Sequence, residues 1–138
     1  MSEELRLSIL SPERRLVESL SVDEVTLTGS EGQIQVLPGH ASMIATLTTG
    51  LFRYRVKSGG TVVGVISSGF CRVSNSEVQI LAETVELKSE IDIDRAKRAQ
   101  RLAEETLQAA NLDVHQFKKY QLKLQRSLIR QQIAGHES

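Results

Sequence analysis

The chain has 138 residues, which is enough for one ordinary domain or for a compact domain with an appendage. Its 17 Lys and Arg residues balance 17 Asp and Glu residues, so no net charge draws the chain towards nucleic acid or anionic lipid. No apolar run approaches the roughly 20 residues that a membrane-spanning helix needs, which argues against an integral membrane protein.

The start of the chain and its cysteine content indicate a reducing compartment. The first ten residues, MSEELRLSIL, are acidic before they are apolar, unlike a secretory signal, and lack the Arg- and Ser-rich character of a transit peptide. Cys71 is the only cysteine, so no disulfide can form within the chain. Because Cys71 lies in an apolar run, we expect a buried and unreactive thiol.

From about residue 4 to residue 88, apolar and polar residues alternate with a period of two. The apolar positions include Leu5, Leu7 and Ile9; Val25 and Leu27; Phe52, Tyr54 and Val56; and Val78, Ile80 and Ala82. Turn signals separate these runs, and the clearest is SGG at 58–60, where glycines accept the positive φ of a tight hairpin. Short strands with regular turns predict an antiparallel β-sandwich or barrel with an aliphatic core, because the chain has no Trp and only 4% aromatic residues.

One turn in this region carries a histidine. In the stretch GQIQVLPGHASM at 32–43, an alternating strand leads into Pro38-Gly39 and then His40. An imidazole at a tight, exposed corner has four possible roles: a catalytic base, a metal ligand, a contact for another protein, or only a turn residue.

The pattern changes after residue 88. Between Asp92 and Ala134 there is no Pro or Gly, and strong helix formers dominate. Ser89 with Asp92 predicts a capping box at the start of a first helix. Near NLDVHQ, Asn111 suits a left-handed C-terminal position, and Asp113 with Gln116 predicts a second capping box. We therefore expect a β domain over residues 1–88 and an antiparallel two-helix hairpin over residues 89–138.

The faces of the two predicted helices differ. Small and apolar residues share one face of the first helix (Ala96, Ala99, Ala103, Leu107 and Ala110) and one face of the second (Val114, Phe117, Leu124 and Leu128). Because an alanine seam buries little apolar area, the hairpin is predicted to be weakly held and able to extend. A basic stripe, defined as Lys119, Lys123, Arg126 and Arg130, follows another face of the second helix. It is either a solvated face or a docking surface for an acidic partner.

Recognisable catalytic motifs are missing from the sequence. It has no Walker A loop, GxGxxG, HExxH, CxxC or GxSxG pattern, and His40, His115 and His136 lack the spacing of a zinc site. A binding or regulatory role is therefore favoured over an enzyme.

Three segments carry a family resemblance. GSEGQIQVLPGHASMIATLTTG at 29–50, SGFCRVSNSEVQILAETVE at 68–86 and IDIDRAKRA at 91–99 occur in an order that closely resembles the epsilon subunits of bacterial and chloroplast F-type ATP synthases (the delta subunit in mitochondria). The resemblance covers essentially the whole chain, and the LPGHA segment is its specific part.

The resemblance implies a non-catalytic rotor subunit at the foot of the central stalk. Such a subunit couples proton flow to ATP synthesis, and its hairpin extends towards the catalytic head to inhibit ATP hydrolysis. The implied partners are the gamma subunit, the ring of c subunits and the alpha and beta subunits, with membrane attachment only through the complex. The implied location is the cytoplasmic face of the bacterial membrane or the stromal face of the thylakoid.

Individual residues acquire roles by the same resemblance. Glu31, Gln33 and His40 match positions that present polar groups to the c-ring, and Gln33 replaces an acid that some members carry. The basic stripe is the candidate inhibitory contact with an acidic segment of the beta subunit. No cofactor is required, but IDIDRA matches a motif at which some members bind ATP, which makes Glu86, Asp92 and Arg95 candidate nucleotide contacts. A further arginine, expected one turn or more along, is displaced here to Arg98 and Arg101, before Leu102. The alternative is that Asp92 caps the helix and Arg95 faces solvent.

Two hypotheses from other functional classes compete with the rotor-subunit hypothesis. A stand-alone ligand-binding β module, dimerised by its hairpin, would form a stable homodimer without affinity for gamma. A switch whose chief role is to sense ATP would bind the nucleotide tightly and lose it on Arg95→Ala.

Overall fold

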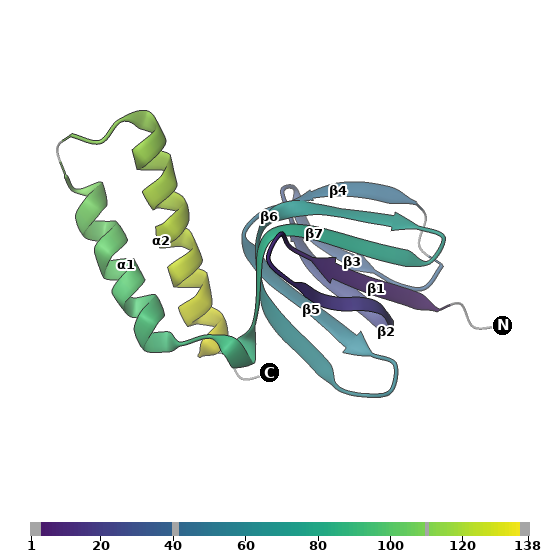
Figure 1. The fold of residues 1–138 in the computed structure, drawn as a ribbon. Coiled ribbons are helices and arrows are strands. Elements are labelled where there is room, and N and C mark those ends of the chain that lie inside the picture. The colour runs from purple at the N-terminus through teal and green to yellow at the C-terminus, as the bar shows by residue number, and fades with distance from the viewer. Residues whose placement is uncertain (1–3, 40–41, 110, 136–138) are drawn as a thin grey trace. The chain divides into compact units, whose positions relative to one another are not determined.

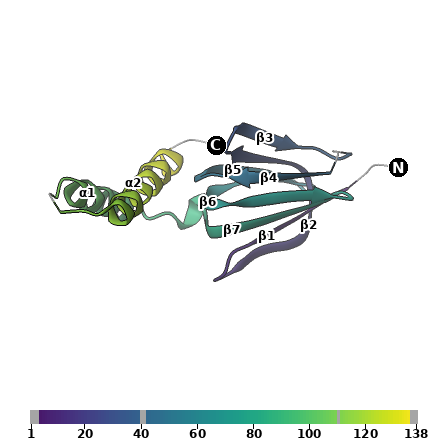
Figure 2. The same cartoon turned by 90° about the horizontal axis from the view of Figure 1, so that it is seen from above.

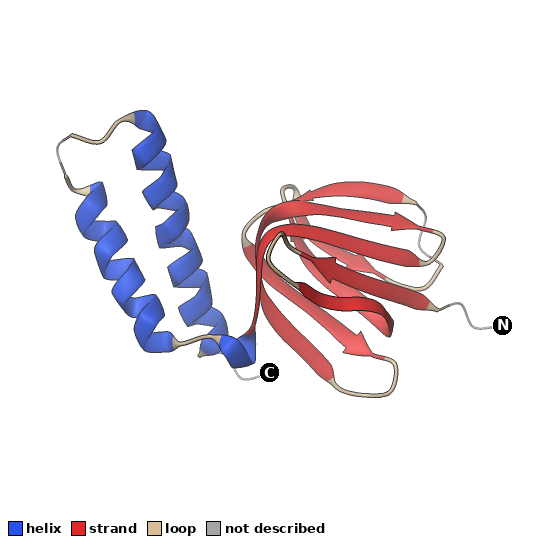
Figure 3. Cartoon of the chain, in the orientation of Figure 1, coloured by secondary structure: helices blue, strands red, loops and turns tan. Residues whose placement is uncertain are grey.

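The structure is a computed structural model, which describes residues 4–39, 42–109 and 111–135. The chain divides into two compact units, Met1–Leu87 and Lys88–Ser138 (Figure 1). The first unit consists of strands and the second of helices, as the colours of Figure 3 show. The sequence predicted this order of elements, and the β-sandwich followed by two helices is confirmed.

The first unit contains seven strands in its described part. They are β1 (Leu5–Leu10), β2 (Arg15–Gly29), β3 (Gly32–Val36), β4 (Met43–Leu47), β5 (Gly50–Val56), β6 (Thr61–Ser74) and β7 (Glu77–Leu87). Seen from above in Figure 2, the strands lie over one another in layers. The long strands β2 and β6 reach across the unit, and each pairs with three or more other strands along its length.

The pairings close into a circuit. β1 pairs with β2, β2 with β5, β5 with β6, β6 with β7, and β7 with β1 again. The sequence predicted antiparallel strands throughout, and one pairing differs, because β1 and β7 run parallel with Leu7 opposite Val78. Parallel neighbours need a long connection, and almost the whole unit lies between these two strands. Closure on both sides leaves β1 without a free edge.

The period of two in the sequence places the core. Leu5, Leu7, Ile9, Val78 and Ile80 are each 0% exposed, so the predicted inward positions of the first and last strands are confirmed. Phe52 and Tyr54 stack with their ring centroids 6.2 Å apart. Cys71 is buried among aliphatic side chains, and burial raises the pKa of its thiol to about 11, so it is unreactive at neutral pH.

Two tight turns follow the predicted chemistry. Gly59 and Gly60 have φ values of 116° and 92°, as required in the hairpin that joins β5 to β6. Asn75 and Ser76 have φ values of 50° and 63° in the turn between β6 and β7, where two residues with positive φ match the twist of the strands.

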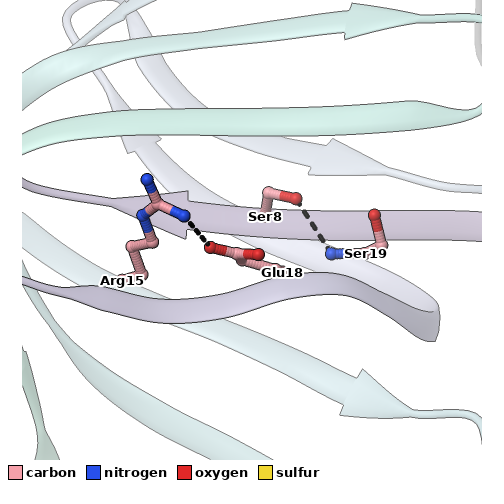
Figure 4. A network of polar contacts seen from close by, with 4 residues as sticks. All are labelled: Ser8, Arg15, Glu18 and Ser19. Carbon is pink, nitrogen blue, oxygen red and sulfur yellow. Dashed lines mark hydrogen bonds and ion pairs between the residues drawn. The ribbon is translucent and has the colours of Figure 1, made fainter.

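A bulge bends β2 beside β1. Leu7 pairs with Leu20 and Ile9 with Val17, so Glu18 and Ser19 together oppose Ser8. Ser19 has a φ of 50°, and its backbone N–H donates to the Ser8 hydroxyl oxygen at 3.0 Å (Figure 4). The Arg15 guanidinium pairs with Glu18 at 2.9 Å across the same bulge.

Ser8→Ala is expected to lower the free energy of unfolding of the β unit by about 0.5–1 kcal/mol, because it leaves the Ser19 N–H to water alone. Urea denaturation followed by circular dichroism measures the change. Ser8→Thr keeps a hydroxyl at this position and is the matched control. Equal stability of the alanine and threonine variants would show that the hydrogen bond contributes nothing.

The second unit begins with a short 3-10 helix, η1 (Lys88–Glu90), followed by α1 (Ile93–Leu107) and α2 (Val114–Ala134). The predicted capping box at Ser89 is wrong, because Ser89 lies in η1 and Asp92 is the N-cap, accepting from the Arg95 backbone N–H at 3.1 Å. The second predicted box is confirmed, with Asp113 and Gln116 bonded reciprocally. In the described part of the chain, no helix combines the length and apolar character that crossing a bilayer requires.

The end of α1 also differs from the prediction. α1 ends at Leu107 with Gln108 as its C-cap, so Asn111 does not hold the predicted position directly after the helix. Ala110, assigned to the apolar face, lies outside the described residues.

The predicted contact between α1 and α2 is confirmed for the described residues of α1 and for one of the four residues of α2. On α1, Ala96 and Ala103 are buried and Ala99 and Leu107 are half-buried. On α2, only Leu124 of the four predicted residues is half-buried; Val114, Phe117 and Leu128 are exposed. The less exposed side of α2 instead carries Tyr120, Leu124, Ser127 and Gln131. Polar side chains are accommodated there because Ser127 and Gln131 find hydrogen-bond partners within the hairpin.

Candidate interaction surfaces

Apolar side chains point outward from adjacent strands of the β unit. Ile44 in β4, Phe70 in β6 and Leu81 in β7 are 76%, 51% and 43% exposed, and we call these three residues the apolar strip. Their neighbours along each strand, including Cys71, Ile80 and Ala82, point into the core, so the pleat forces the strip outward.

The register brings the residues of the apolar strip near one another, although Ile44 pairs directly with the exposed Arg72. Phe70 pairs with Leu81 across β6 and β7, and Leu81 pairs with the half-buried Leu10 of β1. Ile44 lies diagonal to Phe70, because Phe70 pairs with Thr46 two residues further along β4. An exposed aromatic ring among exposed aliphatic side chains is typical of a protein contact surface.

Strands β2, β3 and β5 carry charged and polar outward residues instead. The Arg55 guanidinium lies 3.6 Å from Asp23 and 3.8 Å from Glu24, and Gln35 donates to Glu24 at 3.5 Å. The Lys57 ammonium donates to Glu4 at 3.0 Å, and this hydrogen bond with its positive charge lowers the pKa of the Glu4 carboxyl. Charges paired in this way suit a solvated surface.

Of the three residues expected to face the c-ring, two lie on one hairpin. Glu31 is exposed in the turn between β2 and β3, and Gln33 is exposed two residues later in β3, opposite Thr28. His40 lies outside the described residues. Leu37, just after β3 at the end of the strand away from this turn, is 45% exposed.

The three candidate nucleotide contacts come from different parts of the chain. Glu86 is half-buried near the end of β7 in the first unit, whereas Asp92 and Arg95 are exposed at the start of α1 in the second. One carboxylate oxygen of Asp92 caps the helix, so a structural role is shown for this residue. The chemistry of the set still fits a nucleotide, because the Arg95 guanidinium can pair with phosphate.

The basic stripe runs along α2, which contains no acidic residue at all. Lys119 and Lys123 are exposed, and Arg126 and Arg130 are half-buried. The Lys123 ammonium lies 4.9 Å from the Tyr120 ring centroid, and the Arg126 Nε donates to the Leu122 carbonyl at 3.4 Å. These contacts hold two of the four cations close to the helix surface, which reduces the entropy lost when a partner binds.

Among the residues that the structure describes, no three His, Cys, Asp or Glu side chains are grouped closely enough to hold a metal ion. The described residues form three candidate contact surfaces: the apolar strip, the turn between β2 and β3 with Glu31 and Gln33, and the basic stripe.

Two family models match the chain, one over each unit. Residues 4–88 match "ATP synthase, Delta/Epsilon chain, beta-sandwich domain", and residues 89–135 match "ATP synthase, Delta/Epsilon chain, long alpha-helix domain". The chain belongs to the ATP synthase delta/epsilon family. The predicted resemblance is thereby confirmed, and so is the place of the chain as a non-catalytic subunit.

Relatives in this family align over almost their full length. The chain is 40% identical over 135 residues to the ATP synthase epsilon chain of Trichlorobacter lovleyi, covering 98% of this chain and 96% of that one. It is 38% identical over 132 residues to the ATP synthase epsilon chain of Halalkalibacterium halodurans, with coverage of 95% and 97%.

Solved structures share the fold. A chain in the mitochondrial ATP synthase of Euglena gracilis, solved as its OSCP, F1 and c-ring part, superposes with a TM-score of 0.84 at 22% identity, covering 99% of this chain and 84% of that one. A chain in the central stalk and c-ring of the Tetrahymena thermophila enzyme gives a TM-score of 0.68 at 11% identity, covering 96% and 98%.

The apolar strip was missed by sequence reasoning, although one signal was present. Leu81 occupies an outward position of β7 where alternation predicts a polar residue, and Phe70 does the same in β6 between Gly69 and Cys71. Apolar residues on both faces of a strand would have indicated a second buried surface.

Proposed function

We propose that this chain is the epsilon subunit of the central stalk of an F-type ATP synthase. In this role it couples proton transport to ATP synthesis and inhibits ATP hydrolysis through its C-terminal helices. The observation that carries the proposal is the match of both units to the two domains of the family, with epsilon-chain relatives aligned from end to end. The ATP synthase assemblies in which the fold recurs support the same place in the complex.

Within the complex, the β unit is the anchor. The apolar strip is the surface that packs on the gamma subunit, because an exposed Phe with flanking aliphatic groups supplies the contacts that dominate interface energies. The hairpin tip with Glu31 and Gln33 rests against the polar loops of the c-ring. The chain is then held at the membrane surface only through its partners, on the cytoplasmic face in a bacterium or the stromal face in a plastid.

The helical hairpin is the inhibitory element. An uninterrupted cationic face on α2 fits an acidic surface of the catalytic alpha and beta subunits, because complementary charge steers association and fixes the register of contact. The small side chains between α1 and α2 bury little area, so the hairpin can change its arrangement at low cost in free energy.

ATP hydrolysis by the cognate alpha-beta-gamma complex tests this function. The full chain is expected to inhibit hydrolysis, and a chain ending at Glu90 is expected to bind without inhibiting, since the β unit has its own core. If both bind and neither inhibits, the chain is a coupling element alone. If neither binds, its proposed place in the stalk is wrong.

The same assay tests the basic stripe. Lys119→Glu combined with Lys123→Glu, both exposed, is expected to abolish inhibition without weakening binding. Lys118→Glu with His115→Glu also places two acids on exposed positions of α2 outside the stripe, and serves as the control.

ATP as a regulatory ligand remains a proposal that rests on the chemistry of Asp92 and Arg95. Arg95→Ala is expected to remove ATP binding to the full chain in equilibrium titration while α1 keeps its cap, since Asp92 accepts from the backbone N–H and not from the guanidinium. Unchanged ATP binding in this variant would refute the proposal.

A further inference from the structure

A polar contact lies inside the seam between α1 and α2. The Gln131 Nε2 donates to the Gln100 Oε1 at 2.8 Å and to the Ser127 carbonyl at 3.2 Å. Both glutamine side chains are half-buried, while Ser127 is 0% exposed and its hydroxyl donates to the Leu124 carbonyl at 2.8 Å. The two amides thus bridge the helices by a direct side-chain hydrogen bond.

The surroundings of this bridge are small side chains. Ala96 and Ala103 are 4% and 1% exposed on the facing side of α1. Alanine methyl groups bury little area, so apolar contact alone tolerates a slip of one helix along the other. A hydrogen bond between two amides tolerates no such slip, because both its distance and its direction are restricted.

A pair of amides also suits a contact between two helices that separate reversibly. When the helices part, both amides bind water in place of each other, so their net contribution to the closed state is modest. A pair of leucines at the same positions would hold the closed state more tightly and would specify its register less well.

We propose that the Gln100–Gln131 hydrogen bond is a reversible latch, which sets the register of the closed hairpin and the equilibrium between closed and separated helices. Its consequence for inhibition rests on the proposed function, but the latch itself is a property of the isolated chain.

A double-mutant cycle on the full chain tests the latch. Amide hydrogen exchange of α1 and α2 reports separation, because isolated helices of 15 and 21 residues are marginal in water and exchange once they part. Gln100→Ala and Gln131→Ala are each expected to lower protection. The loss of protection in the double variant is expected to be about 5-fold smaller than the product of the losses in the two single variants. A factor below 2 would overturn the proposal.

Two further variants complete the test. Gln125→Ala alters an exposed glutamine of α2 and is expected to leave protection within 2-fold of the natural chain, and a larger loss would mean that any glutamine of α2 acts as Gln131 does. Gln100→Leu with Gln131→Leu is expected to raise protection several-fold, and a fall would overturn the reversible character of the latch. The leucine pair is also expected to weaken inhibition of the alpha-beta-gamma complex. Raised protection with unchanged inhibition would leave the latch standing and show that inhibition does not depend on separation of the two helices.

Discussion

Replacing Phe70 by aspartate is expected to lower the affinity of the chain for the gamma subunit by about 100-fold or more. Phe70 is the aromatic residue of the apolar strip, and loss of such an anchor from an interface typically costs about 2 kcal/mol or more. The carboxylate would in addition lose water on binding, and tenfold in affinity corresponds to about 1.4 kcal/mol. Titration of purified gamma, or of the alpha-beta-gamma complex, with the variant measures the loss.

The fold of the Phe70→Asp variant should be retained, because the side chain points out of the core. Thr61→Asp introduces the same charge at an exposed position near the other end of β6 and is the matched control. Retained affinity in Phe70→Asp would refute the assignment of the strip to gamma. Equal losses in both variants would show that added negative charge, and not the strip, is responsible.

Gly69→Ala is expected to lower the free energy of unfolding of the β unit by about 3 kcal/mol, a large share of the stability of a small domain. A methyl carbon at this position would overlap the Leu81 carbonyl oxygen and lie 2.8 Å from the Ala82 Cα. Both obstacles belong to the backbone of β7, so no side chain can rotate to make room. Urea denaturation, followed by the near-ultraviolet circular dichroism of the buried Tyr54, measures the effect.

Gly135→Ala is the control for this substitution. Gly135 has a φ of −85° at the end of α2, and an added methyl carbon would lie 3.3 Å from its nearest neighbour, the Gln131 carbonyl oxygen. We expect a change within about 0.5 kcal/mol. If Gly69→Ala were equally mild, β6 and β7 would have to separate more readily than their register indicates.

The β unit shows where sequence reasoning succeeds. Leu5, Leu7 and Ile9 are buried as their alternation predicts, because successive strand residues point to opposite faces whatever the partner strand. The pairing partners of the strands could not be predicted in this way. The parallel pairing of β1 with β7 joins residues more than 70 positions apart, and no local pattern encodes it.

The seam between α1 and α2 shows where sequence reasoning fails. On α2, Phe117 and Leu128 were assigned to the seam because they are apolar, yet Ser127 and Gln131 occupy it. Periodicity identifies which residues share a face, but which face is buried depends on what the facing helix offers. Here that helix offers alanines, which allow close approach, and Gln100, which bonds Gln131.

The sequence by itself determined the two units, the alternating core of the first, the acid-free face of α2 and the family, because all of these follow from local residue order. Only the tertiary structure decided that Ile44, Phe70 and Leu81 form one outward strip and that Gln100 meets Gln131. Each of these depends on register between segments far apart in the chain. Register is set by the packing of the whole unit, and no single segment carries it.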